Sequence, residues 1–456
     1  MKQLIKTFLQ RIGMDKAIAY SSGARIVQGV AGVLTVFFVS TFLTGVEQGF
    51  YFTFGSILAL QVFFELGLTG IMTQYVAHEV SRLKLNNQNV YEGERRFISR
   101  LASLVHFCVK WYTVLAFIVF TFLMVVGFIF FNRYSEGQEN TDWQIPWLLV
   151  CIGTALKLFQ SPLTSIFMGI GKVKEMSAIS FYQQIVIPLA SWIGLACGWK
   201  LYVLGIGYLL SVLVWQLYVQ RHHLHQILIN LWNERITERV AYFKEIFPYQ
   251  WRIALSWVSG YFIFQLFNPV LFATEGAVVA GQMGMTLHAL NAIQSFSFSW
   301  LNTKVPYYSQ LIALKDYLTL DIHFNRTLKQ MTSVCLFLLI MFFIVIWGLN
   351  VTQLKIGGNV LADRFLGYYP MLLMAIPVYL QQYINSWATY LRCHKKEPFL
   401  VNSICAGIVS CFCTFVFGHL FGLYGVTISY FCIAVVFFPW GYWIFKTKKM
   451  IWHAKN

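Results

Sequence analysis

Residues 101–131 read LASLVHFCVKWYTVLAFIVFTFLMVVGFIFF, with Lys110 as the one formal charge in the stretch. A transmembrane helix needs about 20 consecutive, mostly apolar residues, so this segment is long enough to cross a bilayer with residues to spare. Core helices of soluble proteins do not need apolar runs of this length. The stretch therefore predicts a membrane protein, and its neighbours along the chain decide how many times the membrane is crossed.

The composition of the whole chain agrees with this class. Of 456 residues, 58% are hydrophobic and only 11% are charged, whereas soluble domains carry about 25% charged residues. The 42 Phe, 15 Trp and 24 Tyr exclude a disordered chain. The nine cysteines lie almost all within apolar runs and form no CxxC pair, so they are interpreted as small buried hydrophobic residues. No metal site and no cofactor is predicted.

Apolar stretches of similar character recur from end to end and predict an all-α polytopic protein with twelve transmembrane helices. They cover residues 17–43, 50–73, 101–131, 147–168, 177–197, 201–220, 251–273, 278–303, 331–349, 368–391, 399–418 and 422–445. The loops on one side hold only Arg133, Lys200, Lys355 and Arg364 of the 34 Lys and Arg residues, and nearly all others lie on the opposite side. The positive-inside rule then places both termini in the cytoplasm. The excess of +16 is thus mainly a topology signal, and no nucleic-acid partner is needed to explain it.

The spans divide into two halves of six. The turn at 44–49 resembles the turn at 274–281, and the loop at 171–175 resembles the loop at 394–398. Two related halves are common in transporters, which bind substrate between them. The expected domains are an interfacial amphipathic helix (1–16), an N-terminal lobe (17–220), a cytoplasmic linker (221–250), a C-terminal lobe (251–446) and a basic tail (447–456).

Four ionisable residues lie within the predicted spans, all of them in the first half: Arg25, Glu65, Lys110 and Lys157. Charges at such depth are costly and usually mark a cavity or a partner. Arg25 and Glu65 both lie roughly 12 Å from the cytoplasmic boundary, so an ion pair between them is one interpretation. Lys110 could instead extend to the interface, whereas Lys157 lies near the midplane, too deep for that.

The second half offers amides and a histidine in place of charges. They are His288, Asn291, Gln265, Asn268, Gln381 and Asn385. A cationic wall facing a hydrogen-bonding wall suits a substrate with an anionic group and many hydroxyls. Lipid-linked sugars attached through pyrophosphate have both features and a tail that stays in the bilayer.

The opening hairpin carries a resemblance. Its segments SSGAR (21–25), EQGFY (47–51) and FELGLT (64–69) resemble the polysaccharide-exporting branch of the MOP flippase superfamily, the Wzx-like translocases. The resemblance implies two six-helix bundles around a cavity that opens to each side in turn, and an undecaprenyl-pyrophosphate oligosaccharide (an O-antigen, capsule or exopolysaccharide unit) as the substrate. It implies a bacterial inner-membrane location, and a polysaccharide polymerase and a chain-length regulator as partners.

Roles follow residue by residue from the resemblance. Arg25, Lys110 and Lys157 are expected to contact the pyrophosphate, and Glu65 or His288 to couple transport to an H⁺ or Na⁺ gradient. Asn291, Gln265, Asn268, Gln381 and Asn385 are expected to contact the sugars. The second-half cations of some relatives are missing here.

A multidrug antiporter of the same superfamily would need more cavity carboxylates than Glu65. A membrane polymerase, ligase or acyltransferase would need a large outer loop or a cluster of acid and base groups.

Overall fold

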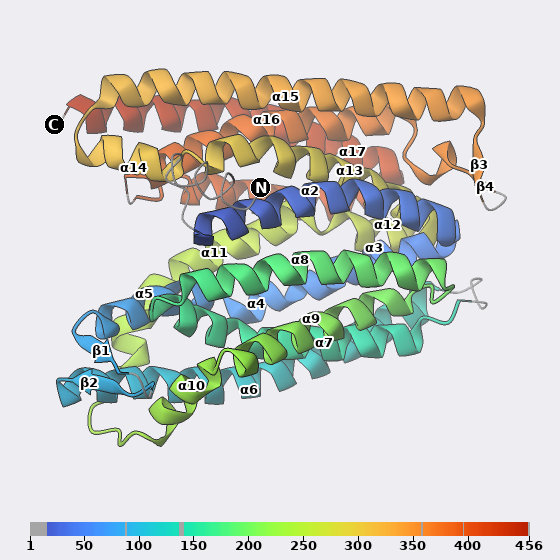
Figure 1. Cartoon of the computed structure of the whole chain (residues 1–456). Coiled ribbons are helices and arrows are strands. Elements are labelled where there is room, and N and C mark those ends of the chain that lie inside the picture. The colour runs from blue at the N-terminus through green and yellow to red at the C-terminus, as the bar shows by residue number, and fades with distance from the viewer. Residues whose placement is uncertain (1–15, 87–88, 136–140, 357–358, 395, 455–456) are drawn as a thin grey trace, which may run out of the picture. The chain divides into compact units, whose positions relative to one another are not determined.

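The chain is an all-α, multi-pass membrane protein with several long apolar helices (Figure 1). The computed structural model describes residues 16–86, 89–135, 141–356, 359–394 and 396–454. The predicted interfacial helix therefore lies outside the described residues, except for Lys16. The described residues form two compact units: those within 16–27, 60–131 and 142–257 make up unit 1, and those within 28–59, 132–141 and 258–454 make up unit 2.

Unit 1 is a helical bundle with a long linker packed on one end. It contains the start of α2 (Lys16–Phe42), then α4 (Val62–Glu65), α5 (Leu68–Val80), β1 (Leu83–Leu85), β2 (Tyr91–Gly93), α6 (Arg95–Tyr134), α7 (Gln144–Gly169), α8 (Val173–Ala196), α9 (Tyr202–Arg221), α10 (Leu224–Asn233), the π-helix η2 (Tyr242–Ile246) and most of α11 (Phe247–Phe264). Helices α7, α8 and α9 lie side by side (Figure 1). The core between them and α6 is built on Trp147, Tyr112, Phe131 and Phe167, all fully buried.

Unit 2 is a second helical bundle. It contains the rest of α2, then α3 (Gly45–Leu58), η1 (Ala59–Gln61) at its boundary, α12 (Phe267–Glu275), α13 (Ala277–Asn302), α14 (Val305–Ala313), α15 (Tyr317–Thr352), β3 (Lys355–Ile356), β4 (Asn359–Val360), η3 (Ala362–Arg364), α16 (Tyr368–Arg392) and α17 (Leu400–Ala454). Helix α16 lies beside both α15 and α17 (Figure 1). Phe324, Trp387, Tyr390 and Phe445 form the aromatic centre of its core.

Each predicted span coincides with helix, but not always with one unbroken helix. The second span is α3 to α5, bent by 43° at its break, and the last two spans form α17, which has a non-helical Gly422 inside. Among the described helices, seven are long and apolar enough to cross a membrane, and the bent pair makes an eighth. The count of twelve crossings and their orientation stay predictions.

The compact units cut the chain differently from the predicted lobes. Residues 28–59, predicted as part of the lobe 17–220, pack with unit 2, and α3 packs extensively on α13. Residues 221–250, predicted as a separate linker, belong to unit 1. Arg100 on α6 pairs with Glu79 on α5 at 2.9 Å and with Glu245 of the linker at 2.7 Å, which fixes the linker to the bundle. The division into two lobes stays a prediction.

The sequence analysis did not predict the two small antiparallel hairpins, β1–β2 and β3–β4. The first connects α5 to α6, and Asn230 on α10 donates a hydrogen bond of 2.9 Å to the Asn89 carbonyl in its loop. The second lies between α15 and α16. Such short strands bury few side chains, so their alternating pattern is too brief to stand out from a polar loop.

Histidine and tyrosine side chains form a cluster where the end of α17 contacts the start of α15. His453 stacks on Tyr317 with ring centroids 4.1 Å apart, and His394 lies 5.8 Å from His453. The Tyr390 hydroxyl donates a hydrogen bond of 2.7 Å to Asp321, which also pairs with Lys449 at 2.7 Å. This cluster attaches the C-terminal helix to the rest of unit 2, and both of its histidines lie outside the predicted spans.

The two histidines of this cluster make its stability depend on pH. Burial lowers the pKa of His394. Burial also lowers the pKa of His453, and this effect outweighs the negative charge of Asp321, which raises that pKa. Both nearby ammonium groups, Lys396 and Lys449, favour the neutral rings. The unfolded chain therefore binds more protons than the folded one as the pH falls below about 6.5, and the folded state loses stability there.

We expect the melting temperature to fall by a few degrees more between pH 7.5 and pH 5.5 in the wild type than in the double variant His394→Asn, His453→Asn. The matched control is His323→Asn, because His323 is exposed on α15 of the same unit; it should keep the wild-type pH dependence. Thermal unfolding in detergent measures the three proteins side by side. Equal losses in the wild type and the double variant would show that these rings do not carry the effect.

Candidate functional site

Glu65 lies at a break in a helix within the second predicted span. It ends α4, and the next two residues adopt left-handed backbone angles, Leu66 with φ 51° and Gly67 with φ 68°. Glycine tolerates this conformation without steric cost, which explains why the helix breaks at this point. Helix α5 begins at Leu68. The carboxylate therefore lies beside a helix N-terminus, where free N–H groups and the helix dipole favour negative charge.

The Glu65 carboxylate is held by hydroxyl groups in unit 1. It accepts a hydrogen bond from Thr69 Oγ at 2.7 Å and a longer one from Ser161 Oγ at 3.4 Å. Tyr112 of α6 is fully buried and lies close enough to Glu65 to interact with its charge. Its hydroxyl has no hydrogen-bond partner among the described residues. Among the residues that the structure describes, the two groups that donate hydrogen bonds to this carboxylate are therefore uncharged hydroxyls.

Lys157 lies on α7, one helical turn before Ser161. Its Nζ is placed over the ring of Tyr208 on α9, 4.7 Å from the ring centroid. A cation over an aromatic face is stabilised by the negative face of the ring. The described part of the chain provides no carboxylate within ion-pair distance of Lys157 and no hydrogen-bond acceptor for its three N–H groups. The ammonium is therefore oriented by Tyr208 and available to an anion.

The other two predicted cations differ from Lys157. Arg25 lies in α2, but its side chain is outside the described residues, so its pairing with Glu65 stays a prediction. Lys110 is exposed on α6, on the same helical face as the exposed Val114 and Phe117. Both interpretations of Lys110, a pyrophosphate contact and a lysine that extends to the interface, remain open. The structure does not bring the three predicted cations into one described cluster.

His288 lies in the interior of unit 2. It forms a hydrogen bond with the backbone of Gly32 on α2, and its ring lies 5.8 Å from that of Phe52 on α3. Its Nε2 atom is buried without a partner among the described residues. A buried imidazole with one free nitrogen can accept or release a proton, but its packing against α2 and α3 serves structure equally well.

The five predicted sugar contacts lie on four different helices or helix ends of unit 2. Gln381 donates to Asn385 at 3.0 Å on α16, and buried Asn268 on α12 donates to Ser56 on α3 at 3.2 Å. Asn291 on α13 and Gln265, at the break between α11 and α12, are exposed. The structure joins two of the five to each other, and the predicted wall as a whole stays a prediction.

Three residues of the site were not predicted: Ser161, Tyr208 and Tyr112. Ser161 could have been found, because it follows Lys157 by four residues and therefore shares its helix face. Tyr208 and Tyr112 carry no charge in spans rich in aromatic residues. Nothing in the sequence shows that α9 lies against α7 or that α6 lies near Glu65.

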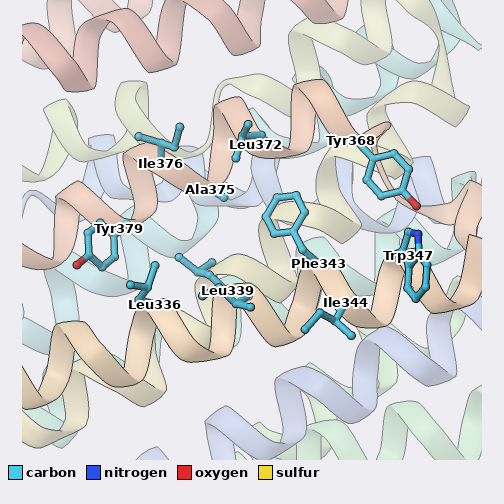
Figure 2. Close-up of a pocket in the computed structure, with 11 residues that line it drawn as sticks. Leu336, Leu339, Phe343, Ile344, Trp347, Tyr368, Leu372, Ala375, Ile376 and Tyr379 are labelled. Atoms are coloured by element: carbon cyan, nitrogen blue, oxygen red, sulfur yellow. The ribbon is translucent and has the colours of Figure 1, made fainter.

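An apolar groove of about 490 Å³ lies between α15 and α16, far in sequence from these charges (Figure 2). Leu336, Leu339 and Phe343 face it from α15, and Leu372 and Ile376 face it from α16. The aromatic residues Trp347, Tyr368 and Tyr379 lie towards its ends (Figure 2). With no charged residue in its lining, the groove suits hydrocarbon and cannot bind a pyrophosphate.

Solved transporters have a similar architecture. A multidrug resistance MATE family transporter of the MOP superfamily, in an inward-facing conformation, matches with a TM-score of 0.64 and 13% identity over 95% of this chain and 99% of that chain. The lipid II flippase MurJ matches with a TM-score of 0.54 and 11% identity over 93% of this chain and 86% of its own. A MOP superfamily transporter from Pyrococcus furiosus, described by the reverse polarity of its binding pocket, has a TM-score of 0.51 and 13% identity over 94% and 95%.

These likenesses establish the fold. The chain has the MOP-superfamily transporter fold, shared with MATE and MurJ proteins at low sequence identity. No family model matches the sequence, and no curated protein matches it. These three structures are transporters rather than enzymes.

Proposed function

We propose that the chain is a flippase that moves an undecaprenyl-pyrophosphate-linked oligosaccharide across the bacterial inner membrane by alternating access. The oligosaccharide would be a repeat unit of O-antigen, capsule or exopolysaccharide. The transporter fold is compatible with this substrate class, since one protein of similar structure is a lipid II flippase. Translocation requires no covalent chemistry.

The observation that carries the proposal is the environment of Lys157. An ammonium within a membrane bundle is costly unless something offsets its charge, and the neighbour that the structure gives it is the Tyr208 ring. A pyrophosphate supplies the missing negative charge. Its oxygen atoms also accept hydrogen bonds from the N–H groups of Lys157, which the Tyr208 ring does not. Lys157 is thus the residue we assign to the pyrophosphate, with Arg25 as a second contact.

Glu65 is the residue we assign to coupling. Among the described residues its carboxylate accepts hydrogen bonds from the hydroxyls of Thr69 and Ser161, and a carboxylate among hydroxyls can bind H⁺ or Na⁺. The helix break next to it gives the carboxylate a place where a local rearrangement of the backbone can follow binding of the ion. His288 is the alternative coupling residue, with its free Nε2.

A multidrug antiporter of the same fold is the second candidate. The observation that favours it is Glu65, because a carboxylate held only by hydroxyls in the described residues can also attract a cationic drug. The similarity to a multidrug MATE transporter is compatible with this alternative. The cation at Lys157 is against it, since like charges repel.

Proteoliposomes separate the two candidates. The probe is a fluorescent polyprenyl-pyrophosphate disaccharide. A reductant that cannot cross the membrane is added outside and quenches the probe in the outer leaflet. The flipping rate is the rate at which probe from the inner leaflet is then quenched. We expect the protein to accelerate this rate at least tenfold over empty liposomes and to leave uptake of a cationic dye unchanged. Dye uptake driven by a pH gradient, with no acceleration of lipid flipping, would overturn the flippase and establish the antiporter.

A further inference from the structure

One end of unit 2 carries a buried polar cluster that neither Lys157 nor Glu65 uses. It joins the turn between α2 and α3 to the segment 361–366 before α16 and to α13. The turn, this segment and the start of α13 all belong to predicted outer loops or border them. The three segments meet at one end of the unit.

Arg364 is the centre of this cluster, and only 5% of it is exposed. Its Nη2 donates a hydrogen bond of 2.6 Å to the carbonyl oxygen of Leu43, directly after the end of α2. Carbonyl groups at a helix C-terminus carry partial negative charge, so a cation binds well there. The Glu47 carboxylate attracts the same guanidinium group.

Gln48 connects all three segments. Only 1% of this residue is exposed, and its Nε2 donates to the Gly281 carbonyl at 2.8 Å and to the Arg364 carbonyl at 3.0 Å. Thr286 on α13 accepts a hydrogen bond of 3.1 Å from the backbone of Leu366. Arg364 and Gln48, with their carbonyl partners, are called the Arg364 latch below.

The latch is poorly suited to a permanent contact. Arg364 Nε and Nη1 and Gln48 Oε1 are buried with no hydrogen-bond partner in the described part of the chain. Apolar side chains of similar volume hold a permanent seam as well as a buried charged group does, or better. Separation of the segments would expose these three atoms to bulk water, which can satisfy them. The unpaired atoms therefore favour a contact that opens and closes.

The chain next to the latch provides places to bend. The boundary between the units falls at Ala59 and Leu60, within the short 3₁₀ turn η1 that follows α3. The left-handed pair Leu66 and Gly67 comes soon afterwards. A 3₁₀ stretch within a longer helix often marks a hinge, so the chain can bend directly after α3.

We infer that Arg364 is the latch residue of a gate formed by the α2–α3 turn, the segment 361–366 and the start of α13. When the gate opens, the bonds to Leu43 and Gly281 break and water hydrates the freed groups. The inference rests on the proposed function, because alternating access needs an end that opens in turn. It adds a gating residue that is distinct from the substrate and coupling residues.

Hydrogen–deuterium exchange of the full-length protein in lipid nanodiscs tests the latch. We expect Arg364→Ala to accelerate exchange at least tenfold in residues 43–49 and 361–366, because backbone exchange reports local opening. Gln48→Ala should accelerate the same two segments by a smaller factor, and it keeps the test valid if Arg364→Ala folds poorly. The control is Arg392→Ala, since Arg392 is exposed and pairs with Glu397 in a different loop of the unit; it should leave both segments unchanged.

Unchanged exchange at 43–49 in both latch variants would overturn the inference. So would an increase spread evenly over α15, α16 and α17, since that marks general destabilisation of the unit. The exchange result does not depend on which substrate is carried. If wild-type protein fails to flip the lipid probe while the latch variants still open locally, the proposed function is wrong and the gate remains.

Discussion

Lys157→Ala is expected to reduce flipping of the pyrophosphate-linked probe roughly 10- to 150-fold, the loss that corresponds to one hydrogen bond to a charged group of about 1.5–3 kcal/mol. The side chain is partly buried between α7 and α9, and its charge meets the face of Tyr208. Removing it leaves no unpaired carboxylate, because the described residues hold none against it. Folding should therefore survive, and surface polysaccharide should disappear while the protein stays in the membrane.

Three variants sharpen this test. Lys157→Arg keeps the charge and should retain part of the rate, and Tyr208→Phe keeps the ring face and should retain most of it. Lys174→Ala is the lysine control, because Lys174 is exposed at the start of α8 and lies outside the predicted spans; a change under twofold is expected. Unchanged flipping in both Lys157→Ala and Arg25→Ala would disprove the cationic site.

The sequence predicted where helices lie because long apolar runs have few alternatives in a bilayer. It could not predict how those helices break. Residues 62–73 form an apolar stretch with Glu65 as its one charge, yet the helix stops at Leu66 because Gly67 permits a left-handed turn. The assignment of residues 28–59 to unit 2 follows from contacts between distant segments, and no local pattern encodes them.

The candidate site was partly predictable for a similar reason. Glu65 and Lys157 stand out because charges within spans are rare. Ser161 and Tyr208 are ordinary residues for a membrane helix, and they gain a role only because Ser161 reaches Glu65 and α7 packs against α9. Arg364 was interpreted as one of few outer-loop cations, and its burial could not be foreseen from a polar loop. The residues that the sequence misses are those whose role depends on a partner helix.

Gly49 and Gly281 are a further case in which the role of a residue depends on a partner helix that the sequence does not reveal. The sequence analysis placed Gly49 at the end of the turn 44–49, and Gly281 at the end of the turn 274–281 as well as within the predicted span 278–303; the structure corrects the two turn assignments. Helix α3 begins at Gly45 and α13 at Ala277, so both glycines lie inside helices. A Cβ atom on Gly49 would lie 2.0 Å from the Ala277 carbonyl oxygen, and one on Gly281 would lie 2.9 Å from the Gly49 nitrogen. The glycines are there because the two backbones touch.

Gly49→Val is therefore expected to force α3 away from α13. The clashing atom belongs to the backbone and cannot rotate aside, so we expect a loss of at least about 1–3 kcal/mol, the cost of overpacking a well-packed contact. Thermal unfolding should show a clear drop in melting temperature, and exchange at residues 43–49 should rise because the Gln48 bond to Gly281 breaks with the seam.

Gly55→Ala is the matched control for this variant. Gly55 lies on the same helix, is exposed, and a Cβ atom there would meet no atom within 4 Å. Alanine is about 1 kcal/mol better than glycine in a helix, so this variant should melt at or slightly above the wild-type temperature. A protein that tolerated Gly49→Val as well as Gly55→Ala would show that α3 and α13 are not in close contact, and the gate would lose the seam that the Arg364 latch closes.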